Sequence, residues 1–336
     1  MASVMVRYPG RACLLGEHCD WAGGFSLTVP LPMGVEVRGE MARADITVHS
    51  ELSGELLEGR WRIDGDHQTS GPLRFVGAAI NVLQQAGITL SPTELWVQSD
   101  LPEGRGFSSS AAFTLGILDA LSRLANQPMS ASELVEMAYQ VEHHQLGIEC
   151  GRLDPAACAA GQPLFLRWTA QKTGQIQMSP QRIQPLGTLH LTVGAFDRPR
   201  NTQQILQTLN KQLKGPVQDP DGDAVREALT TFAENAEQGA YAMQNGDIAG
   251  LGSAMNTTQN AYEEHLAKRF SSTRAPRLIQ VCRDLRKEGA LGAKFSGAGG
   301  DGSVVALFEN ENAARAAAIR LEETDMFSWY VPVEAP

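Results

Sequence analysis

The stretch GRACLLGEHCDWAGG, Gly10–Gly24, concentrates charged groups among glycines and two cysteines. Its charged or titratable residues are Arg11, Glu17, His18 and Asp20. Core strands seldom tolerate so many such groups. Two interpretations therefore fit the stretch. It is either a solvated polar turn, or a place where glycine lets the backbone approach a ligand that the charged side chains recognise.

The length and composition describe a soluble globular chain. It has 336 residues, of which 43% are hydrophobic and 20% charged, and this length favours two domains over one. The formal net charge is −10. Because an acidic surface repels nucleic acid and anionic membranes, we expect neither as a partner. Any phosphate group must then be held by local backbone and a few cations.

The cysteines and the first residues indicate a reducing compartment. The five cysteines are odd in number, widely spaced and without a CxxC pair, which disfavours a disulfide framework and a zinc site. The opening MASVMVRYPG lacks the apolar core of a signal peptide. No stretch approaches the roughly 18 to 20 apolar residues that a membrane helix needs. We expect a cytoplasmic protein, monomeric or homodimeric.

Strand signals dominate the first hundred residues, and helical signals follow. The expected strands are Val4–Tyr8, Ser26–Val29, Gly34–Arg38, Asp45–His49 and Leu95–Ser99, with a helix over Leu73–Ala86. Ala111–Ala125 is apolar almost all round, which predicts a helix buried between other elements. Ser130 and Glu133 form a capping-box pattern that opens a helix through Leu146.

A polar segment separates the two halves of the chain. Around Trp168–Pro180 the sequence turns polar and irregular, so we predict one domain over residues 1–170 and a second over 171–336. In the second, a strand is expected near Leu189–Ala195. Ala224–Leu266 is mostly helical in pattern, with a break near Asn245 and Gly246.

A second glycine stretch, LPEGRGFSSSAA, covers Leu101–Ala112. It places Gly104 and Gly106 between an expected strand and a helix that opens on three serines. Glycine lets backbone amides approach a ligand, and the unpaired amides at a helix start attract anions, so the stretch suits a phosphate. It lacks the lysine of the common P-loop. The alternative is a tight strand-to-helix turn with serine caps.

A third glycine stretch, KFSGAGGDGSVVALF, covers Lys294–Phe308 and contains GxGxxG spacing. A dinucleotide fingerprint should open a helix, whereas these glycines lead into Ser303–Phe308, which reads as a strand. A glycine loop that feeds a strand could instead wrap a substrate. The alternative is a simple β-turn.

The segment VEHHQLGIECGRLDPAA, Val141–Ala157, carries two carboxylates of interest. Glu142 is expected near the end of a helix, where a carboxylate could hold a metal. Asp154 follows a glycine turn and could accept a proton. His143 and His144 are interpreted as solvated or packed residues, because adjacent positions on a helix do not face one point.

Taken in this order, the three glycine stretches resemble the three motifs of the GHMP kinase superfamily, which includes galactokinases, homoserine kinases and mevalonate kinases. The first has the galactokinase form, with Gly-Arg, Gly-Glu-His, a later Asp and paired glycines. EHHQLGIECGRLD also follows the galactokinase pattern. The resemblance spans Pro9 to about Phe308. It implies an α+β fold of two domains, an N-terminal ribosomal-protein-like βαβ domain and a C-terminal ferredoxin-like domain, with the active site in the cleft between them.

The resemblance also implies a role for each matching residue. ATP would be bound by Gly104, Gly106, Ser108, Ser109, Ser110, Gly297 and Gly299. Mg²⁺ would be held by Ser110 and Glu142. Asp154 would orient or deprotonate the acceptor hydroxyl, and Arg11 would hold Asp154 ionised while facing the transferred phosphate. These parts suit phosphoryl transfer, which depends on positioning and on charge neutralisation.

The first stretch would then bind a sugar. By the same resemblance, Glu17, His18 and Asp20 hydrogen-bond sugar hydroxyls, and Gly23 lets the following strand pass close to the site. Carboxylates are good acceptors for paired hydroxyls. The alternative is that Glu17 and Asp20 merely cap turns.

Several residues depart from the galactokinase pattern near the acceptor. Pro155 follows the catalytic aspartate where galactokinases usually have glutamine, Trp21 replaces a tyrosine, and Asp301 lies among the glycines of the third stretch. Arg152 stands where an apolar residue is usual. We hypothesise that Arg152 recognises the anionic group of a sugar acid. The alternative is a salt bridge from Arg152 to Glu149 or Asp301.

The sequence thus predicts an ATP- and Mg²⁺-dependent kinase of a monosaccharide or sugar acid, acting at the anomeric hydroxyl. A mevalonate-type or other non-sugar kinase of the superfamily is one alternative. Another is a non-catalytic sensor of the same fold that binds sugar and ATP. An NAD-dependent oxidoreductase, resting on GAGGDG alone, is a distant third.

Overall fold

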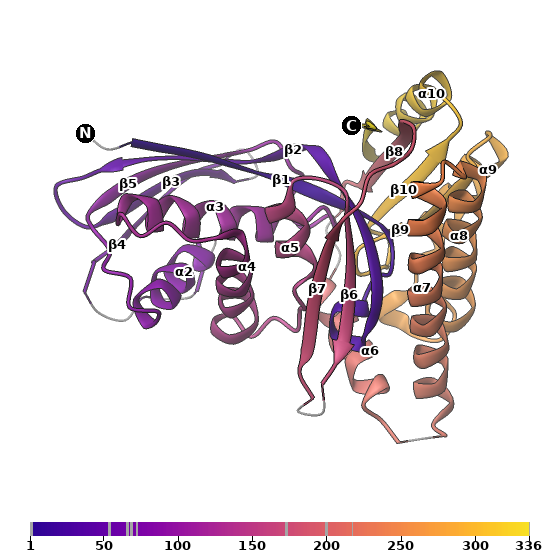
Figure 1. Ribbon diagram of the computed structural model, residues 1–336, viewed down its shortest axis with the longest axis horizontal. Helices are drawn as coiled ribbons and strands as arrows, with labels where there is room; N and C mark the ends of the chain where they lie inside the picture. Colours follow the sequence, from indigo (N-terminus) through magenta and orange to yellow (C-terminus); the bar gives the residue numbers. More distant parts are fainter. Residues whose placement is uncertain are drawn as a thin grey trace. The chain divides into compact units, whose positions relative to one another are not determined.

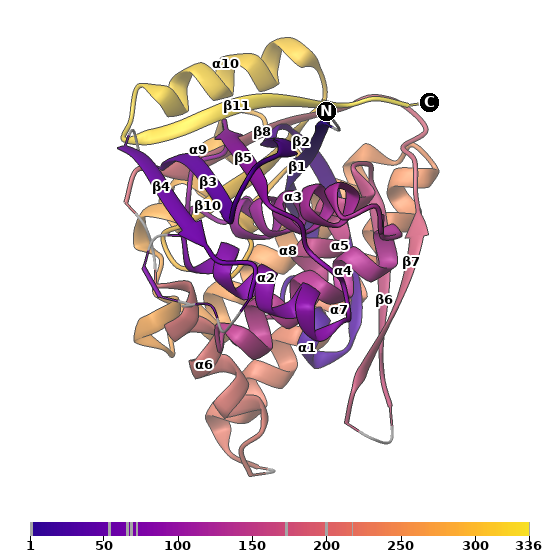
Figure 2. The ribbon, with the colours of Figure 1, turned by 90° about the vertical axis from the view of Figure 1, so that its left-hand side faces the viewer.

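The computed structural model describes residues 3–52, 55–64, 67, 70–71, 73–171, 174–198, 201–216 and 218–335, and Figures 1 and 2 show its ribbon. The chain divides into two compact units, each assembled from separate parts of the sequence. The first unit comprises Met1–Gly10, Leu31–Glu103 and Ser108–Gly161. The second comprises Arg11–Pro30, Gly104–Phe107 and Gln162–Pro336.

The first unit is a mixed sheet with helices packed on it. Its strand order is β4-β3-β5-β2, where β4 is Glu55–Trp61, β3 is Ile46–Leu52, β5 is Thr93–Ser99 and β2 is Gly24–Met41. Residues 31–41 of β2 belong to this unit, and its earlier residues belong to the second. β3 runs parallel to β5, whereas β2 runs antiparallel to β5. β1, Ser3–Leu15, also pairs with β2. Figure 1 shows helices α2 (Arg74–Gln85), α3 (Ser109–Leu124), α4 (Ala131–Tyr139) and α5 (Leu153–Ala160) on one face of this sheet.

Helix α3 is the buried helix that the sequence predicts. Most of its residues are inaccessible to solvent, as expected for a helix that is apolar on nearly every side. Gly116 lets α3 approach β2 closely, because a Cβ there would lie 2.6 Å from the Val37 side chain. The helix that carries the predicted phosphate serines is therefore fixed by its packing.

Helix α4 begins with the predicted capping box. The Ser130 hydroxyl accepts from the Glu133 backbone amide, and the Glu133 carboxylate accepts from the Ser130 amide. The helix continues as a π-helix, Gln140–Gln145, which contains Glu142. Such wide turns often mark functional sites, because they re-aim the side chains that they carry.

The second unit is built on an antiparallel sheet with strand order β11-β8-β10-β9. These strands are β8 (Leu189–Phe196), β9 (Gly292–Ser296), β10 (Ser303–Phe308) and β11 (Met326–Val333). The helices are α1 (Cys19–Ala22), α6 (Thr202–Leu213), α7 (Pro220–Gln244), α8 (Ile248–Ala261), α9 (Pro276–Lys287) and α10 (Glu311–Glu322), with single turns at Tyr262–Ala267 and Ser271–Thr273. Figure 1 shows α7 and α8 side by side, and Figure 2 shows α10 along β11.

Side chains of α8 cover the free edge of β9. The Asn256 carbonyl oxygen accepts from the Ala293 amide at 3.2 Å, and its amide donates to the Leu291 carbonyl at 2.8 Å. The Gln259 carbonyl oxygen accepts from the Phe295 amide at 2.9 Å. An uncovered edge would leave these backbone groups unpaired, so α8 replaces a neighbouring strand and fixes the start of the third glycine stretch.

The predicted α+β organisation is confirmed, and one local prediction is wrong. The segment expected to be polar and irregular forms a hairpin of β6 (Leu164–Ala170) and β7 (Ile176–Arg182), and β6 also pairs with β2. Cross-strand pairing with distant residues decides this structure, which local composition does not reveal. The boundary between residues 170 and 171 stays a prediction. Among the described residues, no helix has both the length and the apolar character to span a membrane.

Candidate active site

Most of the stretch Gly10–Gly24 is buried, since residues 10–19 are buried and residues 20–24 are half-buried, so its interpretation as a solvated turn is wrong. It continues β1 to Leu15 and then turns into α1. The Arg11, Glu17 and His18 residues are only 3%, 1% and 4% exposed. Ordinary core strands do not hold such groups without a specific partner or ligand, which supports the second interpretation.

The backbone around Glu17 is tightly constrained. Gly16 has φ +82° and lies so close to β2 that a Cβ would collide with the Phe25 carbonyl oxygen. His18 also has a left-handed backbone, with φ 68°. A non-glycine residue in this region carries strain, and such strain collects at functional sites. Glu17 is therefore held between two residues of unusual geometry.

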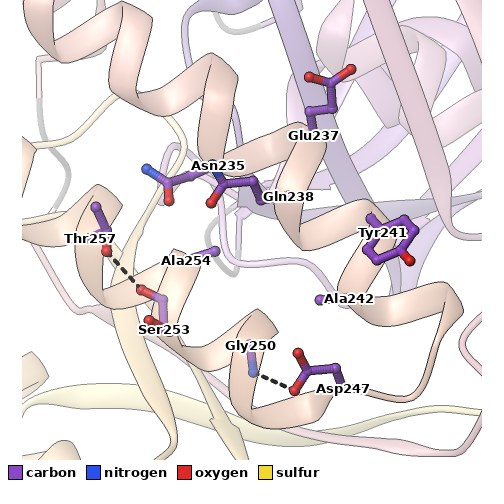
Figure 3. Close-up of a pocket in the computed structure, with 10 residues that line it drawn as sticks. All are labelled: Asn235, Glu237, Gln238, Tyr241, Ala242, Asp247, Gly250, Ser253, Ala254 and Thr257. Atoms are coloured by element: carbon purple, nitrogen blue, oxygen red, sulfur yellow. Dashed lines mark hydrogen bonds between the residues drawn. The ribbon is translucent and has the colours of Figure 1, made fainter.

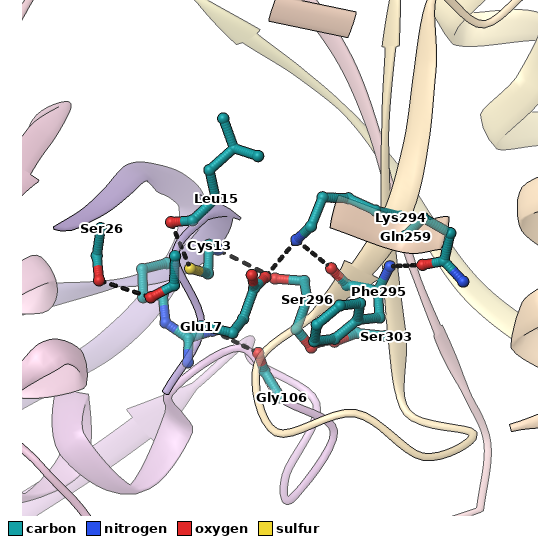
Figure 4. Close-up of polar contacts among 12 residues, drawn as sticks. Cys13, Leu15, Glu17, Ser26, Gly106, Gln259, Lys294, Phe295, Ser296 and Ser303 are labelled. Atoms are coloured by element: carbon teal, nitrogen blue, oxygen red, sulfur yellow. Dashed lines mark hydrogen bonds and ion pairs between the residues drawn. The ribbon is translucent and has the colours of Figure 1, made fainter. Parts of the chain in front are cut away.

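The first stretch contacts the second through Arg11, within the second unit. The Arg11 amide donates to the Phe107 carbonyl at 3.2 Å, and its guanidinium donates to the Gly106 carbonyl at 2.6 Å. Figure 4 shows Gly106 in this network. The arginine predicted to face phosphate thus also fixes the glycine loop predicted to bind it.

The first stretch also contacts the third. The Cys13 amide donates to the Ser296 hydroxyl at 3.0 Å, and the Ser303 hydroxyl donates to the Ser296 carbonyl at 2.7 Å. The Lys294 ammonium forms an ion pair with Glu17, and both side chains are buried (Figure 4). Segments of all three glycine stretches therefore meet in one unit.

The chain Gly104–Ser110 passes from the second unit to the first. Arg105 donates to the Phe196 carbonyl at 2.6 Å and to Asp197 at 3.1 Å. Phe107 is fully buried, with its ring edge-to-face to Trp329 at 5.9 Å. Ser108, where the first unit resumes, has φ 62° and a buried hydroxyl with no hydrogen-bond partner among the described residues.

A carboxylate site lies in the first unit near the start of α3. Glu142 is 8% exposed, and its Oε1 has no hydrogen-bond partner among the described residues. Burial and the nearby Asp154 carboxylate raise the pKa of Glu142 to about 8, while a hydrogen bond with Ser110 opposes that rise. The serine and glutamate predicted to share a metal are thus neighbours.

Comparison with known proteins identifies the family. The family model described as GHMP kinases N terminal domain matches residues 74–162, and the model described as GHMP kinases C terminal matches residues 240–324. The chain belongs to the GHMP kinases. It is accordingly an ATP-dependent phosphotransferase with a hydroxyl acceptor, as the sequence predicts.

Relatives of this GHMP kinase cover nearly its whole length. The galactokinase of Pyrococcus furiosus is 26% identical over 98% of this chain and 96% of its own. The galactokinase of Thermotoga petrophila is 25% identical over 90% of this chain and 88% of its own. Lactococcus lactis galactokinase complexed with galactose has a TM-score of 0.77 at 20% identity, covering 99% of this chain and 94% of its own. Methanococcus jannaschii mevalonate kinase has a TM-score of 0.77 at 17% identity, covering 100% of this chain and 99% of its own. The predicted two-domain GHMP kinase fold is confirmed.

The residues of this GHMP kinase fit a bound Mg²⁺. Serine hydroxyl and carboxylate oxygens are the hard ligands that this ion prefers, and Glu142 offers an orphaned buried oxygen. Within the described ranges, no group of three or more His, Cys, Asp or Glu residues could form a metal site by itself.

Arg152 of this GHMP kinase pairs with a residue that the sequence analysis did not consider. Its guanidinium donates to both carboxylate oxygens of Glu136, at 2.7 and 3.1 Å, and lies 3.8 Å from the centre of the Tyr139 ring. The ion pair lowers the pKa of Glu136. The alternative partners were Glu149 and Asp301. Asp301 instead accepts from the Leu278 amide at 2.9 Å, at the start of α9.

The third glycine loop joins β9 to β10, so it is not a strand-to-helix dinucleotide turn. Gly297 and Gly299 have φ +80° and +93°. A Cβ at Gly299 would lie 2.8 Å from the Tyr262 ring, and the Gly300 amide donates to the Tyr262 hydroxyl at 2.7 Å. Tyr262 thus shapes the loop predicted to contact ATP.

Two predicted acceptor-binding residues lie at α1. Asp20 is half-buried on this helix, and Gly23 follows the helix with φ +96°.

A groove lies between α7 and α8. Its volume is about 530 Å³, and Figure 3 shows that its lining comes from the two helices, including Asn235, Tyr241, Asp247 and Thr257. None of its lining residues is a predicted site residue. Small residues that face each other across two helices leave such grooves, and we assign this one no function.

Sequence reasoning missed three residues that shape the site: Arg105, Tyr262 and Lys294. Lys294 alone carried a usable signal, since it is the one charged residue in the short strand that opens the third stretch. The other two act through contacts with distant parts of the chain. No local pattern marks such contacts.

Proposed function

We propose that this GHMP kinase transfers the γ-phosphate of ATP to the anomeric hydroxyl of a monosaccharide, with Mg²⁺ as cofactor. One observation carries the proposal furthest. Glu17, in the stretch of galactokinase form, is 1% exposed and keeps one carboxylate oxygen without a partner among the described residues. A buried acceptor of this kind is costly unless a ligand hydroxyl pairs with it. The galactokinase relatives over nearly the whole chain support a sugar as that ligand.

The nucleotide would be held mainly by backbone. We assign its phosphates to Gly104, Gly106 and Ser108–Ser110, where the amides at the start of α3 favour an anion. Gly297 and Gly299 would approach it from the third loop. Ser110 and Glu142 would hold Mg²⁺, which supplies neutralisation of charge on the phosphoryl oxygens.

The chemical step requires one base and one cation. Asp154 would accept the proton of the acceptor hydroxyl as the new oxygen–phosphorus bond forms and the bond to ADP breaks. Arg11 would stabilise the negative charge of the transferred phosphoryl group. Its hydrogen bond to the Gly106 carbonyl restricts its orientation before substrate arrives, which reduces the cost of ordering it in the transition state.

Glu17, His18 and Asp20 would hydrogen-bond the hydroxyls of the acceptor. Gly23 would let the following strand pass close to the site. The pairing of Arg152 with Glu136 favours a neutral monosaccharide over a sugar acid, because that guanidinium already has a carboxylate partner. Recognition of a sugar acid by Arg152 stays a prediction, which a substrate screen that includes uronic acids tests. The cytoplasmic location and the monomeric or homodimeric state also stay predictions.

A substrate screen tests this function. ADP release is measured with ATP, Mg²⁺ and a panel of neutral hexoses, uronic acids, mevalonate and homoserine. We expect turnover with a neutral hexose, and Asp154→Asn should lower its kcat by roughly 10²- to 10⁴-fold. Asp223→Asn, which removes a charge from an exposed pair on α7, serves as control and should keep wild-type activity. Turnover of mevalonate instead would favour a non-sugar kinase, and sugar binding without ADP release would favour a sensor.

A further inference from the structure

Lys294 is a fully buried lysine whose charge has a specific partner. It is 0% exposed and lies on β9, and its ammonium pairs with Glu17 and donates to the Phe295 carbonyl. It also lies 4.6 Å from the centre of the Phe295 ring. Removing a lysine from water costs several kcal/mol, which only good geometry repays. An apolar residue would fill this position at lower cost, so the ion pair needs an explanation beyond packing.

Glu17 uses its two carboxylate oxygens differently. Oε1 contacts Lys294, whereas Oε2 is buried with no hydrogen-bond partner among the described residues. An ionised carboxylate can accept several hydrogen bonds, so this arrangement leaves unused capacity on one side only. The constrained backbone at Gly16 and His18 limits where Glu17 can move. The side chain therefore has one oxygen committed to protein and one available to a ligand.

We propose that Lys294 is a positioning residue for the phosphate acceptor. It holds Oε1 of Glu17 so that Oε2 accepts a hydrogen bond from one hydroxyl of the bound sugar. This inference rests on the proposed function, in which Glu17 binds the acceptor. Lys294 touches no substrate atom in this account, and it acts only through the orientation of Glu17.

The surroundings of Lys294 are built to keep that orientation. Gln259 pairs with the backbone amide of Phe295, directly after Lys294, and Asn256 pairs with Ala293, directly before it. Ser296, on the same strand, accepts from the Cys13 amide in the first stretch. A binding group held to within a few tenths of an ångström needs such support from rigid elements. The ion pair thus connects β9, which these contacts hold in place, to the carboxylate that binds the ligand.

The competing explanation is that the pair only neutralises two buried charges. The double variant Lys294→Met with Glu17→Gln separates the two explanations, because it removes both charges and keeps similar volumes. Neutral replacement of a buried pair is often tolerated by the fold. The urea midpoint of the double variant should therefore lie nearer to the wild-type midpoint than the midpoint of Lys294→Met alone does. The reference for catalysis is Glu17→Gln alone, because that change already removes the carboxylate that binds the acceptor. A positioning role predicts that the double variant has an acceptor KM at least roughly threefold above that of Glu17→Gln, with a similar ATP KM, because Lys294 no longer orients the side chain at position 17. Neutralisation alone predicts equal acceptor KM values for the two variants.

Two further measurements sharpen the test. Lys287→Met removes an exposed lysine from α9, and we expect wild-type acceptor and ATP KM values for this control. A series of monodeoxy sugars should show one hydroxyl whose removal raises the acceptor KM in wild type but has little further effect in the double variant. That hydroxyl is the one that pairs with Oε2.

The outcomes separate this inference from the proposed function. If wild type phosphorylates a sugar and the double variant has the same acceptor KM as Glu17→Gln alone, the positioning role is wrong and the function stands. An equal rise in the acceptor KM and the ATP KM would also overturn it. If wild type phosphorylates no sugar, the function itself is wrong. Because the double variant leaves no unpaired buried charge, the test does not depend on the stability of Lys294→Met.

Discussion

Lys294 and Glu17 lie 277 positions apart in the sequence, and their side chains form an ion pair that is 0% and 1% exposed. This pair joins the third glycine stretch to the first at the point where we place the sugar. Its burial makes the two residues dependent on each other, since neither charge has water as an alternative partner.

The first prediction concerns stability. Lys294→Met should lower the free energy of unfolding by about 3–5 kcal/mol, because it leaves the Glu17 charge buried and unpaired. The double variant with Glu17→Gln should recover most of that loss. Urea unfolding of wild type, Lys294→Met and the double variant measures these free energies. A double variant no more stable than Lys294→Met would contradict the coupling of the pair.

Arg105 gives a second prediction, about nucleotide affinity. It fastens the predicted phosphate loop to the end of β8 through the Phe196 carbonyl and Asp197. Arg105→Ala should raise the ATP KM roughly tenfold, the equivalent of about 1.4 kcal/mol, which lies near the value of a charged hydrogen bond. The acceptor KM should change little.

Asp197→Asn is the matched control for Arg105. The Asp197 side chain is 66% exposed, and exposed ion pairs contribute little. The bond to the Phe196 carbonyl would remain, so we expect an ATP KM close to wild type. Equal effects of the two substitutions would mean that the ion pair, and not the backbone contact, holds the loop.

The predicted metal site gives a third prediction. Glu142→Gln should raise the Mg²⁺ concentration needed for half-maximal activity by roughly tenfold or more, because a neutral amide is a weaker ligand than a carboxylate. Calorimetric titration of Mg²⁺ into the protein with ADP should show the same loss. Glu136→Gln, which changes a glutamate already paired with Arg152, should keep the wild-type requirement. If both variants bind Mg²⁺ as wild type does, Glu142 is not a ligand.

Thiol reactivity gives a fourth prediction. Cys13, Cys19, Cys158 and Cys282 are buried, whereas Cys150 has intermediate exposure. Burial raises the pKa of Cys282 to about 12 and that of Cys19 further. Since the thiolate is the reactive form, a pKa raised above the assay pH leaves these groups protonated and slow at pH 8. A chromogenic disulfide reagent should therefore label Cys150 first. Loss of the fast phase in Cys150→Ser would confirm the assignment, and its persistence would contradict it.

Local signals in the sequence predicted local structure well. The capping box of Ser130 and Glu133 forms as expected, because both partners lie in one helical turn. The break near Asn245 and Gly246 separates α7 from α8, since glycine there has φ +71°. The order of the three glycine stretches predicted the family, which the comparisons confirm.

The remaining features depend on contacts that no local pattern contains. Whether Arg11 and Glu17 are solvated or buried is decided by partners far along the chain, at Gly106 and Lys294. The hairpin of β6 and β7 forms where the composition predicted irregular structure, because β6 pairs with β2. The alternative considered for Arg152 was an ion pair with Glu149 or Asp301, and Arg152 instead pairs with Glu136 on α4.

Phosphorus NMR of the product tests the central claim most directly. The protein is incubated with ATP, Mg²⁺ and the neutral hexose that gives the fastest ADP release. We predict a new phosphomonoester signal that is absent with Asp154→Asn and whose coupled proton, identified by proton–phosphorus correlation, is the anomeric one. Correlation of the phosphorus signal with any other sugar proton would contradict the anomeric assignment. Inorganic phosphate as the only new signal would contradict sugar phosphorylation altogether.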